Sequence, residues 1–175
     1  AAAPVIAEAA FLVCQLESPL DTVRRAIGIA RAHGVMVVFN PAPARPLDDA
    51  LLSQVDYLVV NETEASQLSG VAVDDPQGAV RAAAALRARG AAVVLLTMGE
   101  QGVLVACPDY TRFIPAVQVD AVDTTAAGDT FVGSLTVGLA RGQDLGAAVV
   151  EAQYAAALTV TRIGAQGAIQ TRDEV

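Results

Sequence analysis

The sequence predicts an α/β fold built on a mainly parallel sheet. Short, continuously apolar runs alternate along the chain with longer segments that have the periodicity of helices. Strands without polar alternation are typical of a parallel sheet that helices cover on both faces. No repeat, low-complexity tail or linker interrupts the pattern, and a length of 175 residues suits one domain. We therefore expect one domain over residues 1–175.

The elements follow from where each apolar run begins and ends. Gly34 and Pro41 bound one valine-rich run, and Gly90 closes the helical pattern that precedes another. The expected strands are Ala10–Leu16, Val35–Asn40, Tyr57–Asn61 and Ala91–Thr97. The expected helices are Leu20–Ala32, Asp75–Arg89, Ala127–Arg141 and Leu145–Arg162. A short antiparallel excursion, Val103–Cys107 and Thr111–Ile114, is expected around Pro108-Asp109.

Composition excludes several classes of function. The net charge of −8 argues against nucleic acid or an anionic membrane as a partner. No apolar run approaches a membrane span, and the first residues lack the basic start of a signal peptide. Cys14 and Cys107 lie in apolar runs, so we expect buried free thiols and a cytoplasmic protein.

The basic residues narrow the chemistry further. All eleven Lys and Arg residues are arginine, which excludes a P-loop lysine or a Schiff-base lysine within these residues. The only histidine, His33, precedes Gly34 at the end of an expected helix. We expect it to cap that helix rather than to act in catalysis, because no acid or nucleophile adjoins it.

The stretch from Val122 to Phe131 is the most informative in the chain. It passes through small residues and reaches Asp129 at the start of an apolar helix. A helix start attracts anions, so a carboxylate there is better explained by chemistry than by affinity, and a general base fits the position. Ordinary helix capping by the Asp and Thr residues is the alternative.

Polar residues also follow the expected strands directly. Ligands of open α/β sheets bind outside the carboxyl ends of the strands. We therefore expect these residues to share one rim with Asp129. They are Glu17, Asn40, Asn61 and Gly99.

Several motifs in this order carry a resemblance to a known family. Asp123-Thr124-Thr125-Ala126-Ala127-Gly128-Asp129 is close to the pattern Asp-Thr-x-Gly-Ala-Gly-Asp, with Ala126 in place of the first glycine. The accompanying motifs are Gln15-Leu16-Glu17-Ser18-Pro19, Asn40-Pro41-Ala42-Pro43-Ala44-Arg45, Asn61-Glu62-Thr63-Glu64-Ala65, Thr97-Met98-Gly99-Glu100-Gln101-Gly102 and Val160-Thr161-Arg162-Ile163-Gly164-Ala165-Gln166. Together they resemble the PfkB/ribokinase family of carbohydrate kinases, which implies a ribokinase-like three-layer α/β/α fold with a mainly parallel central sheet.

The resemblance implies a catalytic role for the Asp129 region. Asp129 matches the base that takes the proton of the sugar's primary hydroxyl. The backbone N–H groups of Ala126, Ala127 and Gly128 match the hole that steadies the transferring phosphoryl group. Glu17 matches an acid that contacts sugar hydroxyls, and a plain acid at a helix start is its alternative.

The resemblance also implies a site for ATP and Mg²⁺. Asn61 and Glu64 match a motif that organises Mg²⁺ and phosphate, with Glu64 acting through a water. On the residues alone, Asn61 could simply end a strand, and the acids Glu62 and Glu64 could be solvated. The nucleotide-contacting positions are Thr97, Gly99, Glu100, Gly102, Gly128 and Gln153. The loop over 97–102 is also expected to be a hairpin between the strands Ala91–Thr97 and Val103–Cys107, and both interpretations can be true together.

A monovalent cation, K⁺, is a further implied activator. The matching positions are Asp123, Thr125, Thr159, Arg162, Gly164 and Ala168. Gly167-Ala168 departs from the Pro-Ser that many relatives carry, which leaves the last ligand open.

These residues predict ATP-dependent phosphorylation of D-ribose to D-ribose 5-phosphate. The alternatives are another sugar or nucleoside kinase of the family, or a truncated nucleotide-binding module without catalysis. Full-length members are nearly twice as long, and their sugar-binding half and β lid have no counterpart in these residues. We therefore expect a C-terminal, nucleotide-binding part, inactive alone, from a protein that dimerises through its lid.

Overall fold

A computed structural model describes residues 2–171 and 174–175. The chain separates into two compact units. The first comprises Ala1–Met98 and Val103–Phe113, and the second comprises Gly99–Gly102 and Ile114–Val175. The single domain that the sequence predicted stays a prediction, and each unit is described by itself.

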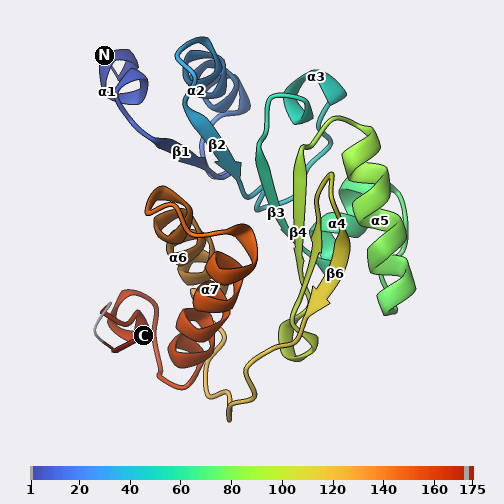
Figure 1. The fold of residues 1–175 in the computed structure, drawn as a ribbon, viewed down its shortest axis with the longest axis vertical. Coiled ribbons are helices and arrows are strands. Elements are labelled where there is room, and N and C mark those ends of the chain that lie inside the picture. Colours follow the sequence, from blue (N-terminus) through green and yellow to red (C-terminus); the bar gives the residue numbers. More distant parts are fainter. Residues whose placement is uncertain (1, 172–173) are drawn as a thin grey trace. The chain divides into compact units, whose positions relative to one another are not determined.

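A six-stranded sheet in the order β1-β2-β3-β4-β5-β6 organises the first unit (Figure 1). The four strands β1 (Phe11–Cys14), β2 (Met36–Phe39), β3 (Tyr57–Asn61) and β4 (Val93–Thr97) run parallel to one another. They lie within the apolar runs that predicted them. This confirms an α/β fold with a mainly parallel sheet.

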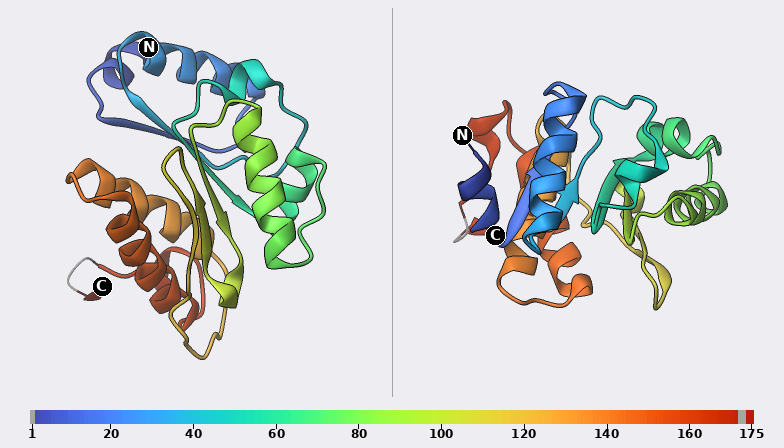
Figure 2. Two further views of the ribbon diagram at one scale, coloured as in Figure 1. Left: turned by 45° about the vertical axis from the view of Figure 1, so that its right-hand side comes forward. Right: turned by 90° about the horizontal axis from the view of Figure 1, so that it is seen from above.

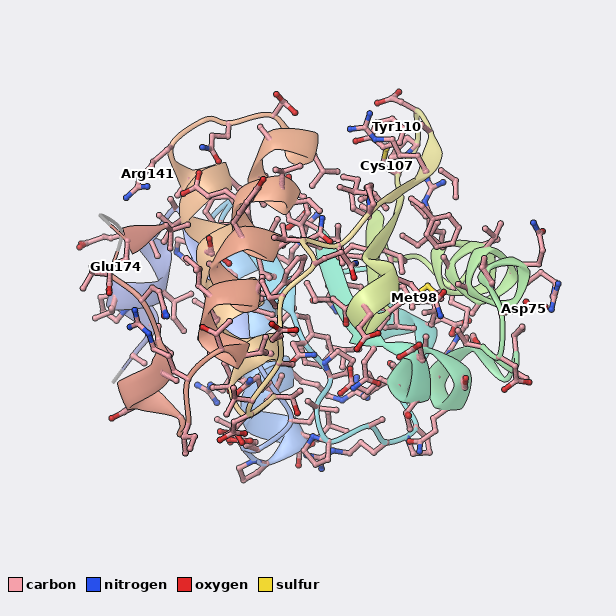
Figure 3. All side chains as sticks on the ribbon, turned by 90° about the horizontal axis from the view of Figure 1, so that it is seen from below. Asp75, Met98, Cys107, Tyr110, Arg141 and Glu174 are labelled. Atoms are coloured by element: carbon pink, nitrogen blue, oxygen red, sulfur yellow. The ribbon has the colours of Figure 1, made fainter. Side chains whose placement is uncertain are left out.

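Antiparallel pairing completes the sheet. Strand β5 (Val103–Ala106) pairs antiparallel with β4, with Thr97 opposite Val103. Strand β6 (Thr111–Ile114) follows a short turn, where the Cys107 N–H donates to the Tyr110 carbonyl at 2.9 Å (Figure 3). The predicted excursion is confirmed, and so is the hairpin over 97–102.

Apolar helix faces supply the core of the first unit. Helix α2 (Leu20–Ala32) buries Val23, Ile27 and Ala30, the face that its periodicity predicted. Helix α5 (Pro76–Ala88) buries a face rich in alanine, which allows close approach to the strands. Burying each leucine or isoleucine here contributes about 1.5–3 kcal/mol.

Three short helices of this unit were not predicted. They are α1 (Ala3–Ala7), α3 (Asp49–Leu52) and α4 (Glu62–Ser69). Helix α4 begins with Asn61 as its N-cap in a complete capping box with Glu64. The Asn-x-x-Glu spacing is the signal that could have predicted it.

The second unit is built on two helices. Helices α6 (Ala127–Ala140) and α7 (Leu145–Val160) lie side by side (Figure 2). Two short 3₁₀ turns, η1 (Gly99–Gln101) and η2 (Gln166–Ala168), complete the unit. Both long helices begin where the sequence predicted and end one or two residues earlier.

The predictions for the histidine and the two cysteines can also be compared with the structure. His33 is the C-cap of α2, as expected. Both cysteines are free, and Cys107 is buried, but Cys14 is only half-buried because β1 is an edge strand. Partial burial raises the pKa of the Cys14 thiol. No helix among the described residues is long and apolar enough to span a bilayer.

Candidate functional site

The carboxyl edge of the parallel strands gathers polar residues of the first unit. Asn61 ends β3 directly beside Thr97, which ends β4. The Thr97 hydroxyl donates to the Val60 carbonyl at 3.4 Å. Asn40 follows β2, and its N–H donates to the Cys14 carbonyl at 2.9 Å. The structure therefore brings Asn40 and Asn61, two residues of the expected rim, to one edge together with Thr97.

Glu64 is held at the same edge by its capping box. Its N–H donates to Asn61 Oδ1 at 2.8 Å, and its Oε2 accepts the Asn61 N–H at 2.9 Å. The Asn40 amide lies 3.5 Å from the same Oε2. Glu64 is 8% exposed, which corrects the alternative of a solvated acid. Local chain geometry and a neighbouring strand end together bury this carboxylate.

The donor set suits a water-mediated Mg²⁺ site. Hydrogen bonds from the described residues reach only Oε2 of Glu64, which leaves Oε1 to accept from a water. Mg²⁺ keeps several waters and touches few protein oxygens, so one buried carboxylate beside Asn61 fits it. The described residues contain no cluster of three or more His, Cys, Asp or Glu side chains that could hold a metal ion.

Glu17 lies in the turn between β1 and α2. Its side chain is exposed, whereas the preceding Leu16 is buried at 2% exposure. The Leu16 N–H donates to the Ala42 carbonyl at 2.9 Å, so the proline-rich loop is fastened to this turn. The backbone bond of Leu16, next to Glu17, therefore helps to fix the position from which the Glu17 carboxylate extends.

The start of α6 differs from the starts of four other helices. An Asp or Asn side chain caps α3, α4, α5 and α7, whereas α6 begins at Ala126 with no side-chain cap. Ala126 has a left-handed backbone, with φ 62° and ψ 6°. Ordinary capping, the alternative for this segment, is therefore not what the structure shows.

The first N–H groups of α6 are mostly available to a ligand. In the described part of the chain, Ala126 and Gly128 donate their N–H groups to no other residue, and Ala127 donates to the Thr124 carbonyl at a long 3.3 Å. Uncapped N–H groups at a helix start attract anions. Asp129 lies exposed in this first turn, as predicted.

A buried pair of hydroxyls joins α6 to α7 directly after Asp129. Thr159 is 0% exposed and its hydroxyl lies 3.2 Å from that of Thr130. The same Thr159 hydroxyl donates to the Ala155 carbonyl at 3.0 Å. Thr130 was not a predicted site residue, because a single threonine between Asp129 and Phe131 carries no pattern.

Asp123 ties the segment before α6 to the segment after α7. Its Oδ1 accepts the N–H of Thr125 at 2.9 Å and the Thr125 hydroxyl at 2.6 Å. Its Oδ2 accepts the Gly164 N–H at 2.9 Å. The bond from the Thr125 hydroxyl, and then those from the two N–H groups, lower the pKa of Asp123 to about 2.

The remaining predicted cation positions lie on the same stretch of chain. The Val160 carbonyl accepts from Val122 and Asp123, and Arg162 pairs with Glu174 at 3.0 Å. Ala168 is buried at 0% exposure in η2. The Thr159 carbonyl accepts the Arg162 N–H at 3.1 Å, and the K⁺ ligand set stays a prediction.

The loop over Gly99–Gly102 packs on the segment that leads to Asp123. A Cβ on Gly102 would lie 2.1 Å from the Ile114 carbonyl oxygen, and the φ of Gly102 is +105°. Both the lack of space and the backbone conformation therefore require glycine. The Gln118 amide donates to the Glu100 carbonyl at 3.2 Å. Gln153, the remaining nucleotide position, is buried on α7 at 8% exposure.

Comparison with known proteins agrees with these motifs. The sequence matches the pfkB family of carbohydrate kinases over residues 1–172. This chain belongs to that family. It is 46% identical to a ribokinase of Haemophilus influenzae, over 97% of this chain and 55% of the relative. It is 40% identical to a deoxyribokinase of Salmonella typhi, over 89% of this chain and 51% of the relative.

A solved structure extends the likeness to the fold. The ribokinase of Arabidopsis thaliana complexed with ribose and ATP matches with a TM-score of 0.93 and 26% identity. The match covers 98% of this chain and 56% of the Arabidopsis chain. The fold is therefore ribokinase-like, and the chain spans about half the length of the curated relatives it matches.

Proposed function

We propose that this pfkB chain is the nucleotide-binding part of a kinase that transfers the γ-phosphoryl group of ATP to D-ribose, giving D-ribose 5-phosphate. The single observation that carries the proposal is the start of α6. There an exposed carboxylate, Asp129, follows N–H groups that no side chain caps. Helices α1 and α2 also begin without a side-chain cap, and α6 differs from them in the left-handed backbone of its N-cap, Ala126.

Asp129 acts in this proposal as the general base. It accepts the proton of the sugar's primary hydroxyl while that oxygen attacks the γ-phosphorus in line, and the bond to the β-phosphate oxygen breaks. The N–H groups of Ala126, Ala127 and Gly128 donate to the equatorial oxygens as charge spreads over them. The loop Gly99–Gly102 and Gln153 hold the nucleotide.

Metal ions have defined places in the proposal. Glu64 and Asn61 would hold the water shell of Mg²⁺, which would supply positive charge to neutralise the phosphates of ATP. As the family resemblance implies, carbonyls around Asp123, Thr159 and Gly164 would hold K⁺. The same resemblance supports a homodimer formed by the lid of the longer protein.

Ribose is the proposed sugar because Glu17 stands in the motif Gln-Leu-Glu-Ser-Pro. The 40% identity to a deoxyribokinase makes a deoxysugar the second candidate. Comparing kcat/KM of the full-length protein for ribose, 2-deoxyribose and fructose tests the choice. A preference for another sugar over ribose would refute the substrate but not the kinase.

The variant Asp129→Asn tests the reaction itself. We expect the full-length protein to lose kcat by about 10²- to 10⁴-fold, as for a lost general base, while its affinity for ATP changes less than about threefold. Asp120→Asn is the matched control, because Asp120 is exposed on the segment that leads to α6. Turnover of the Asp129 variant within about threefold of the wild type would remove Asp129 from the base role.

A further inference from the structure

The proline-rich loop after β2 is bound to the turn that carries Glu17. The Nη2 atom of Arg45 donates to the Leu16 carbonyl and, at 3.4 Å, to the Ser18 carbonyl. These two carbonyls lie on either side of Glu17 in the chain. With the Leu16 N–H bond to Ala42, three hydrogen bonds cross between the loop and the turn.

The turn has few other means of holding its shape. Helix α2 follows it with Pro19 as N-cap and no side-chain cap. Residues 17–19 are exposed, so apolar packing does not orient the Glu17 carboxylate. A guanidinium is a rigid planar donor, and one nitrogen that bonds both carbonyls sets the distance between residues 16 and 18.

We propose that Arg45 is a positioning residue for sugar binding: it fixes the turn on which Glu17 stands and thereby sets the affinity for the sugar. This inference rests on the proposed function, in which Glu17 contacts the sugar hydroxyls. In this inference Arg45 acts without touching the sugar, because its Nη2 bonds go to the backbone of the turn. Its effect therefore passes through Glu17.

The test uses the full-length protein and three variants. Arg45→Ala should raise KM for ribose about tenfold, the effect of one lost hydrogen bond of a charged group, with KM for ATP within about twofold. Arg45→Lys, which keeps a charged donor without the planar fork, should raise it less. Glu17→Gln alone should raise KM for ribose about tenfold or more, and adding Arg45→Ala to it should raise KM less than about twofold further.

Arg31→Ala is the matched control. Arg31 bonds Asp56 from the end of α2, at the opposite, amino edge of the parallel strands. It should lower the melting temperature as Arg45→Ala does but leave KM for ribose unchanged. This separates a loss of sugar positioning from a general loss of stability.

The outcomes separate the two proposals. If Glu17→Gln raises KM for ribose and Arg45→Ala does not, the positioning role is wrong and the sugar kinase stands. If the two changes raise KM independently in the double variant, Arg45 does not act through Glu17 and the inference is also wrong. If Glu17→Gln has no effect on ribose, the sugar contact and the inference both fail.

Discussion

Ala126 at the start of α6 offers a sharp test of the site's backbone. In the described part of the chain it is the only non-glycine residue with a positive φ, at 62°. A left-handed conformation costs an L-residue about 1–2 kcal/mol, because its Cβ crowds the following carbonyl oxygen. The family pattern has glycine here, and Ala126→Gly removes that Cβ.

The expected gain is smaller than the strain. Glycine gives up about 0.5–1 kcal/mol through the greater freedom of its unfolded chain. Subtracting the central values leaves a net increase of about 0.75 kcal/mol in the free energy of unfolding, within a range of about 0 to 1.5 kcal/mol. Ala127→Gly is the matched control, because Ala127 is the first residue of the helix and has no positive φ. It should lose about 0.5–1 kcal/mol.

Urea unfolding of the full-length protein, followed by circular dichroism, measures both variants. The adjacent substitutions should change the unfolding free energy in opposite directions, with the same dependence on urea. If Ala126→Gly destabilised the protein as much as Ala127→Gly, Ala126 would carry no strain and our account of the α6 start would be wrong. The N–H donors survive both changes, so kcat should fall far less than with Asp129→Asn.

Three further predictions concern charge, cation and the chain itself. The pKa of Asp123 is lowered from 3.8 to about 2, so the ionised carboxylate stabilises the folded state above about pH 4, and this stabilisation is lost as the pH falls toward 2. The urea midpoints of the wild type and of Asp123→Asn should therefore converge over that pH range. A constant difference between the two midpoints would contradict the assignment. Replacing Na⁺ by K⁺ should raise kcat of the full-length protein, because a cation held around Gly164 steadies the donors of α6, and a flat response in a coupled ADP assay would exclude the site. The isolated 175 residues should bind nucleotide weakly, dissolve poorly and phosphorylate no ribose. A turnover of about 1 s⁻¹ with ribose would instead show that these residues contain a complete sugar site.

Much of the candidate site could be predicted because its signals are local. Asn61 and Thr97 end apolar runs, and parallel strands align their carboxyl ends, so both were expected at one edge of the sheet; that their strands are neighbours is seen only in the structure. The position of Asp129 in the first turn of α6 follows equally from small residues before an apolar helix.

The amino-acid sequence by itself determined the α/β class, the order of the elements along the chain and the family, because periodicity and short motifs depend on residues near one another in the chain. Only the tertiary structure decided that Glu64 is buried, that Arg45 holds the turn of Glu17, and that Thr159 meets Thr130. The Arg45 and Thr159 contacts join residues 29 positions apart. A hydrogen bond across that separation leaves no periodic trace in a single sequence, since its geometry exists only once the strands and helices have packed.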